Sequence, residues 1–70
     1  MKYVFDSQTG LYLSVHGESL ASCEWVEGQE NATQYENGDD IAAALNTETS
    51  SSDRFTGTLP GGNPPTKPHG

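Results

Sequence analysis

The sequence has almost none of the residues that usually hold very small proteins together. Cys23 is the only cysteine among 70 residues, which excludes an internal disulfide. His16 and His69 are the only histidines, so we expect no structural metal site and no metal cofactor. Chains below roughly 40 residues seldom fold without disulfides, metal or a partner. The foldable part of this chain, which the composition places at residues 1–46, is close to that limit and is expected to need a tight core, self-association or docking on another protein.

Long apolar runs are missing as well. No stretch approaches the ~18 apolar residues that a membrane-spanning helix needs. Lys2 and Asp6 interrupt the N-terminus too early for the apolar core of a signal peptide. A lone cysteine without such a signal is typical of a reducing cytoplasm or of an assembly built there. We expect no membrane partner.

Positive charge is scarce. Three lysines and arginines face ten acids, for a net charge of −7. Residues 1–46 carry all of this charge, with one cation against eight acids, and residues 47–70 are neutral. Because such a surface repels phosphate, direct nucleic-acid binding is disfavoured and a basic protein surface is favoured. An equally good interpretation is that the acidity only keeps a small protein soluble.

The N-terminal residues carry a period-two apolar pattern. Residues 2–6 form a short aromatic and apolar run, and residues 7–10 form a turn cluster that ends in glycine. In residues 11–16, the leucines and the valine alternate with polar residues, which places Tyr12 on the opposite, exposed face. The pattern predicts a β-hairpin with Gly10 at positive φ in its turn.

The next residues predict further strands and a helix. Residues 20–26 suit a third strand, and residues 33–36 suit a short fourth strand. Asn37–Asp40 resembles a helix start, followed by the helix-forming run 41–45 and a C-cap at Asn46. The expected fold class is α+β, a three- to four-stranded antiparallel meander with one C-terminal helix. The predicted core is Tyr3, Phe5, Leu11, Leu13, Val15, Cys23, Trp25, Tyr35, Ile41, Ala44 and Leu45.

Composition changes near residue 46. All four prolines and four of the eight glycines follow residue 56, and residues 47–70 have only two large apolar side chains. This predicts an acidic mini-domain over residues 1–46 and an extended Ser/Thr/Pro/Gly-rich tail over residues 47–70. The alternatives for the tail are a clamp on a partner and a solubilising segment. The residues predicted to contact a partner are Tyr12, Arg54, Phe55 and Leu59.

No catalytic constellation is recognisable. His16 and Cys23 could approach each other across strands, but a mini-domain offers no deep pocket for a nucleophile and its base. Asp39 and Asp40 are adjacent, so they point to different sides of a helix and suit its first turn. We therefore predict a non-enzymatic protein without catalytic residues or cofactors.

Five short motifs follow one another in the first two thirds of the chain. They are Tyr3-Val4-Phe5, Thr9-Gly10-Leu11-Tyr12-Leu13-Ser14, Trp25, Glu30-Asn31-Ala32-Thr33-Gln34-Tyr35 and Ile41-Ala42-Ala43-Ala44-Leu45. This order resembles small phage- and prophage-encoded proteins with a "TGKYL" hairpin, a tryptophan and a short Ala-rich helix. The chain departs from that pattern at Leu11, where lysine is usual, and in its acidity. The resemblance implies a viral setting and transfers no functional residue.

Two functions follow as hypotheses. The first is a phage structural accessory protein, such as a capsid decoration, cement or minor virion protein, which binds neighbouring virion subunits through the mini-domain and the tail. The second is an acidic phage-encoded inhibitor of a basic host protein that handles nucleic acid or acts in defence. The corresponding locations are the virion and the host cytoplasm, and an oligomer is compatible with either. The scattering of the acids over turns and strands favours the first.

Overall fold

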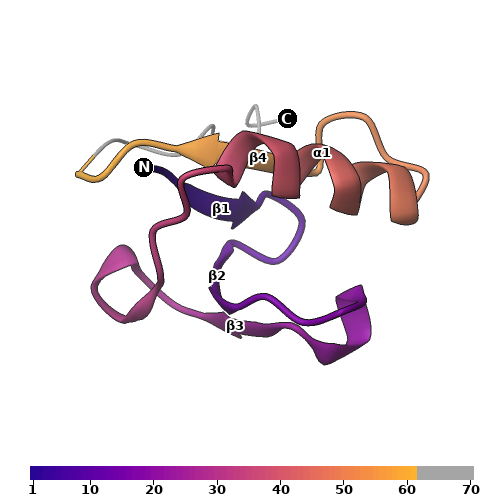
Figure 1. Cartoon of the computed structure of the whole chain (residues 1–70). Coiled ribbons are helices and arrows are strands. Elements are labelled where there is room, and N and C mark those ends of the chain that lie inside the picture. The colour runs from indigo at the N-terminus through magenta and orange to yellow at the C-terminus, as the bar shows by residue number, and fades with distance from the viewer. Residues whose placement is uncertain (62–70) are drawn as a thin grey trace, which may run out of the picture.

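The protein forms one antiparallel four-stranded sheet with one helix against one face (Figure 1). The computed structural model describes residues 1–61. The strand order is β3-β2-β1-β4, which confirms the α+β prediction. The elements are β1 (Tyr3–Asp6), β2 (Leu11–Val15), the 3₁₀ turn η1 (Leu20–Ser22), β3 (Glu24–Val26), the 3₁₀ turn η2 (Gln29–Asn31), α1 (Gly38–Glu48) and β4 (Phe55–Thr58).

The predicted N-terminal hairpin is present. β1 and β2 pair with Phe5 opposite Tyr12 and Asp6 opposite Leu11. Gly10 has φ 77°, a left-handed value that side chains disfavour, and its amide donates to the Asp6 carbonyl over 2.8 Å. Local sequence therefore determines this turn.

The alternation of β2 breaks at Ser14. The pairing register between β2 and β3 shifts between Leu13, which lies opposite Trp25, and Val15, which lies opposite Glu24. A bulge of this kind turns the residue after it toward the other face of the strand. Val15 is accordingly 48% exposed, so its predicted place in the core is wrong.

The segment after η2 crosses the end of the sheet instead of forming the fourth strand predicted at residues 33–36. Lys2 and Tyr35 exchange two backbone hydrogen bonds of 2.9 and 2.8 Å. The hydroxyls of Thr33 and Tyr35 both donate to the Ser14 carbonyl, at 2.7 and 3.0 Å. This segment therefore satisfies the carbonyl at the bulge. The predicted third strand is also shorter, because its first residues form η1.

The fourth strand lies in the predicted tail. β4 pairs with β1, with Phe55 opposite Asp6 and Thr58 opposite Tyr3. The folded unit therefore continues past Asn46 through β4, which corrects the boundary predicted at residue 46. The helix is consequently followed by a strand. The rest of the predicted tail, residues 62–70, lies outside the described residues.

Each face of the sheet carries a buried cluster. On the α1 face the buried core is Val4, Leu13, Ile41, Ala42, Leu45 and Phe55. On the other face Tyr3, Phe5 and Tyr12 form a second buried cluster. The prediction that Tyr12 is exposed is therefore wrong. Of the other predicted core residues, Ala44 is exposed, since α1 turns Ala42 inward instead, and Leu11, Cys23, Trp25 and Tyr35 are half-buried.

Helix α1 lies against β4 as well as covering the sheet. A side chain at Gly57 would collide with the Asp39 carboxylate in the first turn of the helix. Toward the other end of α1, the Asn46 side-chain amide donates to the Phe55 carbonyl at 2.9 Å and accepts from the Phe55 amide at 2.8 Å. Asn46 thus pairs with the two backbone groups of Phe55 that a fifth strand would otherwise bond, so the sheet ends at β4.

Replacement of Asn46 tests this assignment. Asn46→Ala leaves a buried donor and a buried acceptor of Phe55 unpaired, so we expect a loss of about 1–3 kcal/mol in the free energy of unfolding. Urea unfolding followed by the fluorescence of Trp25, whose ring lies 5.6 Å from that of Phe55, measures the loss. Asn31→Ala, the same truncation at an exposed asparagine, is the control. Equal stability of both variants would contradict the role of Asn46.

Candidate functional site: the acidic surface

Asp6 is a buried carboxylate, 3% exposed, at the end of β1. Arg54 donates to both of its oxygens, from Nε and Nη2, over 3.1 Å each. The Gln8 amide donates to the same carboxylate at 2.9 Å. The Arg54 guanidinium also lies 4.8 Å from the centre of the Phe55 ring, within cation–π range. The pair therefore joins the hairpin turn to the start of β4.

The surroundings of Asp6 keep it ionised. Burial by itself would raise the pKa of the Asp6 carboxyl. Hydrogen bonds from Arg54, the Gln8 amide and Thr9, together with the positive charge of Arg54, outweigh burial and lower the pKa of Asp6. Asp6 is therefore ionised in the folded protein, and both of its carboxylate oxygens already accept hydrogen bonds from Arg54 and Gln8.

Three of the four residues predicted to contact a partner have internal roles. Tyr12 is 7% exposed and Phe55 is 2% exposed, so both belong to the core. Arg54 is bound to Asp6. Leu59 alone of the four is largely exposed, at 61%. The apolar and basic residues around position 55 belong to a buried strand and its ion pair. Nothing in the sequence singles out Asp6, one of ten acids, as the partner of Arg54.

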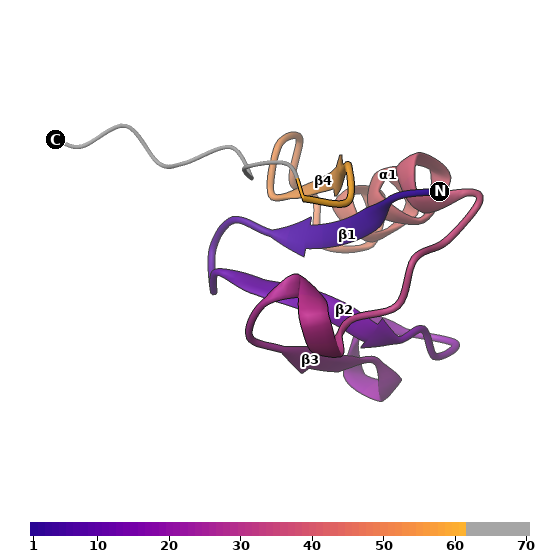
Figure 2. The ribbon, with the colours of Figure 1, turned by 90° about the vertical axis from the view of Figure 1, so that its left-hand side faces the viewer.

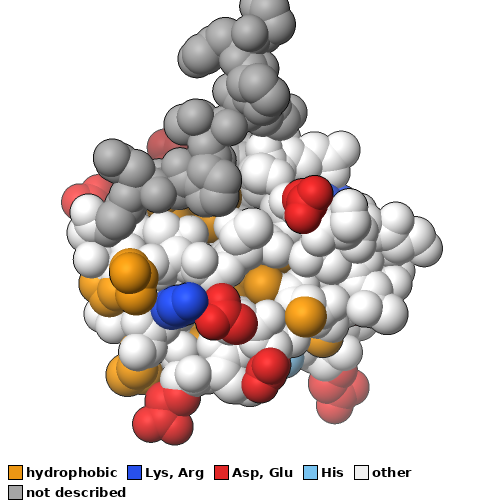
Figure 3. Space-filling view, turned by 90° about the horizontal axis from the view of Figure 1, so that it is seen from above, with side chains coloured by type: hydrophobic (Ala, Val, Ile, Leu, Met, Phe, Trp, Pro, Cys, Tyr) orange, Lys and Arg blue, Asp and Glu red, His pale blue; other side chains and the backbone are white. Residues whose placement is uncertain are grey.

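The remaining acids have no cation to balance them. All ten acids lie between residues 3 and 53, a stretch without lysine or arginine. Asp39 is paired with Lys2 at 2.9 Å, and Asp6 with Arg54, so eight carboxylates lack a cationic partner within residues 1–61. In Figure 3 the blue side chains lie beside red ones, while further red side chains stand around the rim.

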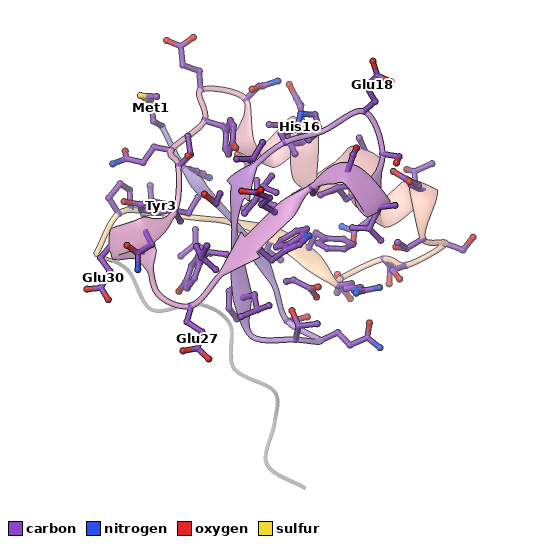
Figure 4. The ribbon with its side chains drawn as sticks, turned by 90° about the horizontal axis from the view of Figure 1, so that it is seen from below. Met1, Tyr3, His16, Glu18, Glu27 and Glu30 are labelled. Atoms are coloured by element: carbon purple, nitrogen blue, oxygen red, sulfur yellow. The ribbon has the colours of Figure 1, made fainter. Side chains whose placement is uncertain are left out.

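Half of these eight carboxylates lie along one edge of the sheet. They are exposed residues on β3, which is one of the two outer strands, and on the loops at its two ends. Figure 4, seen from the β3 side, shows three of them pointing outward. The four residues, called here the β3-edge acids, are Glu18, Glu24, Glu27 and Glu30. The simplest role for them is to keep this open strand edge from pairing with other chains.

Both cations lie on the far side of the sheet from these acids. Lys2 precedes β1 and Arg54 precedes β4, whereas β2 separates β1 from β3. Within residues 1–61 no internal cation therefore neutralises the β3 edge, and its negative potential extends into solvent. Along the sequence these acids are spread over turns and strands. The strand order of the sheet brings them together along its β3 edge.

Other chemistry-bearing residues do not converge on a site. His16 is exposed, with its ring 6.5 Å from that of Tyr35, and the Cys23 thiol donates to the Ser19 carbonyl at 3.3 Å. Among the described residues no group of three or more His, Cys, Asp or Glu side chains could hold a metal ion. Helix α1 has 11 residues, and no helix within residues 1–61 is long and apolar enough to cross a bilayer.

Comparison of the chain with protein-family models, with curated proteins and with solved structures finds no match. The function must therefore be argued from the surface itself.

The Asp6–Arg54 pair generates a pH prediction. Since the pKa of Asp6 is lowered on folding, its contribution to stability is full above the unfolded value of about 3.9 and is lost as pH falls through the folded value. Asp6→Asn should lower the free energy of unfolding at pH 7 by about 2–3 kcal/mol, less than for a fully enclosed pair because Arg54 is 25% exposed. The substitution should also flatten the decline of the free energy of unfolding below about pH 4.

Denaturant unfolding at several pH values between 3 and 7 measures both effects. Asp53→Asn, at an exposed aspartate beside Arg54, is the matched control for the loss of a carboxylate and should cost less stability at pH 7 than Asp6→Asn. A profile that is the same in wild type and Asp6→Asn would show that Asp6 does not link folding to pH.

Proposed function

We propose that the protein is a small non-enzymatic binding module that docks onto a basic protein surface through the β3-edge acids. The observation that carries the proposal is four exposed carboxylates along one outer strand, with both cations of residues 1–61 engaged elsewhere. Uncompensated charge of one sign accelerates association with the opposite sign and gives orientation to the encounter. The same field disfavours phosphate backbones, so the partner is a protein and not a nucleic acid.

A basic protein that handles nucleic acid is the partner class that suits such a surface. Its binding site is already positive, and a row of carboxylates on an ordered backbone can occupy it in place of phosphates. Glu24 is held on a strand, and Glu30 lies in η2, which the backbone bond from the Ala32 amide to the Gln29 carbonyl closes at 3.1 Å. Carboxylates on an ordered backbone lose less conformational entropy on binding than carboxylates of an unfolded segment. This corresponds to the inhibitor hypothesis.

A role in a phage particle is the second candidate. It is supported by Leu59, an exposed leucine that follows β4 directly and adjoins Pro60. An exposed leucine beside a proline-rich segment suits an apolar contact with a neighbouring subunit. Arg54 and Phe55, which the sequence predicts to share that contact, are used inside the domain, so this candidate depends on fewer residues than the sequence suggests.

Two charge-matched variants test the first candidate. Glu24→Gln/Glu27→Gln/Glu30→Gln neutralises the β3 edge, and Glu36→Gln/Asp40→Asn/Asp53→Asn removes the same three charges around α1. We expect the edge variant to bind an octalysine peptide roughly tenfold more weakly than wild type, and the α1 variant to lose less than about threefold. NMR titration in roughly 50 mM salt gives both affinities and maps the shifted residues, and higher salt should abolish binding.

The two triples separate a docking surface from a general charge effect. Equal weakening in both would mean that net charge alone matters, which is the solubility interpretation of the acidity. Capture of virion subunits that resists roughly 1 M salt and is lost in Leu59→Ser would favour the second candidate instead.

A further inference from the structure

One of the four asparagines of the chain, Asn37, is followed by glycine. The others precede an alanine, a threonine and a proline; they are Asn31, Asn46 and Asn63. The backbone nitrogen after an asparagine can attack the side-chain carbonyl, and a glycine nitrogen is the least shielded because glycine has no Cβ. A proline nitrogen carries no proton to lose and cannot take part. Asn37 is therefore the asparagine whose sequence context most favours this reaction.

The structure leaves the Asn37 side chain available for it. Asn37 is exposed and directly precedes α1, but its side chain makes no capping hydrogen bond to the helix. The Asn46 side chain, by contrast, is held by two hydrogen bonds to the backbone of Phe55. Because no capping bond fixes the Asn37 carboxamide, it can turn toward the nitrogen of Gly38.

The backbone at this peptide bond slows the attack without preventing it. Asn37 has φ −106° and ψ 36°, which does not align its side chain with the Gly38 nitrogen, so ψ must rotate before a ring can close. The Asn37 carbonyl accepts from the Ile41 amide over 2.9 Å, and this bond breaks on rotation. The Gly38 amide donates to the Tyr35 carbonyl over a long 3.3 Å, and this bond breaks as well. Both lie at the end of a helix, where local opening costs least, so the rate should follow the opening of the first turn of α1.

We propose that Asn37 is a site of spontaneous deamidation whose isoaspartyl product releases the start of α1 from β1. The Gly38 nitrogen loses its proton and bonds to Cγ of Asn37, the Cγ–Nδ2 bond breaks, and ammonia leaves a succinimide ring. Water then opens the ring. Cleavage between the Gly38 nitrogen and Cγ gives an ordinary aspartate. Cleavage between that nitrogen and the main-chain carbonyl carbon gives isoaspartate, whose main chain is longer by one atom, and either product carries one more negative charge.

A longer main chain does not fit the packing of α1 on β1. Figure 2 shows the N-terminus beside the start of α1. Gly38 is buried there, and a Cβ on it would lie only 3.0 Å from the Lys2 carbonyl oxygen. Lys2 exchanges two backbone hydrogen bonds with Tyr35 and pairs with Asp39 at 2.9 Å, so it holds the chain on both sides of the modified peptide bond. An extra main-chain atom between these two contacts must loosen one of them, because closely packed groups leave no room for it.

Mass spectrometry of the aged full-length protein tests the site. The protein is kept in mildly alkaline buffer at physiological temperature and digested, and electron-transfer fragmentation identifies isoaspartate. We expect deamidation at Asn37 to be roughly tenfold faster than at Asn31 or Asn46, and about tenfold faster again in denaturing urea, where the helix no longer restrains the peptide. Asn37→Ser, which keeps a favourable residue before the helix, should remove this deamidation. Deamidation of the folded protein that is no faster at Asn37 than at Asn31 would overturn the proposal.

Amide hydrogen exchange separates the longer main chain from the added charge. The isoaspartyl form, isolated by chromatography, is compared with Asn37→Asp, which has the same charge and an ordinary main chain. We expect the amides of Lys2 and Tyr35 to exchange roughly tenfold faster in the isoaspartyl form. Asn37→Asp should exchange as the wild type does, since aspartate is also favourable before a helix. Equal exchange in the two forms would overturn the release of α1. No basic partner enters these tests, so they succeed or fail separately from the β3-edge proposal.

Discussion

The fold depends on one buried ion pair. Asp6 and Arg54 are 48 residues apart, and their contact attaches the last strand to the first hairpin. Ser7 strengthens the junction, since its amide and its hydroxyl both donate to the Arg54 carbonyl, at 2.8 and 2.9 Å. If β4 separated from β1, an ionised carboxylate would be left without its partner, which is costly. The pair thus makes β4 an obligatory part of a core that residues 1–46 alone could not complete.

The scarcity of cationic side chains also determines the charge of the surface. Lys2 ties the start of β1 to Asp39 in α1, and Arg54 ties β4 to Asp6, so both cations of residues 1–61 serve the fold. Every other acid faces solvent or a neutral donor, as Glu48 does where it accepts from the Leu20 amide at 3.0 Å. A strongly one-signed exterior is therefore a direct consequence of how the interior is held together. The function is therefore argued from the acidic surface.

Local patterns predicted the local elements well, and the nonlocal ones poorly. The β1–β2 hairpin and helix α1 follow from glycine placement, alternation and helix propensity within a few residues. β4 has four residues and one large apolar side chain, so only its pairing with β1 identifies it. The prediction that Tyr12 is exposed was wrong because an alternating pattern distinguishes the two faces of a strand but does not show whether both faces are buried. Of the four residues predicted to bind a partner, only Leu59 is largely exposed. An isolated apolar residue in a polar segment suits a binding site as well as a buried strand, and Phe55 belongs to a buried strand.

The loop after β3 serves both the acidic edge and the interior. Glu27 and Glu30 belong to the β3-edge acids, and the same loop contributes Ala32, which packs against the buried cluster of Tyr3, Phe5 and Tyr12. Its Gln29 side chain also bonds to the Leu59 carbonyl and the Gly61 amide, beyond the end of β4. The edge acids on this loop are therefore attached to a backbone that the interior already fixes. A basic partner would meet carboxylates whose positions are set before binding, which reduces the conformational entropy lost on association.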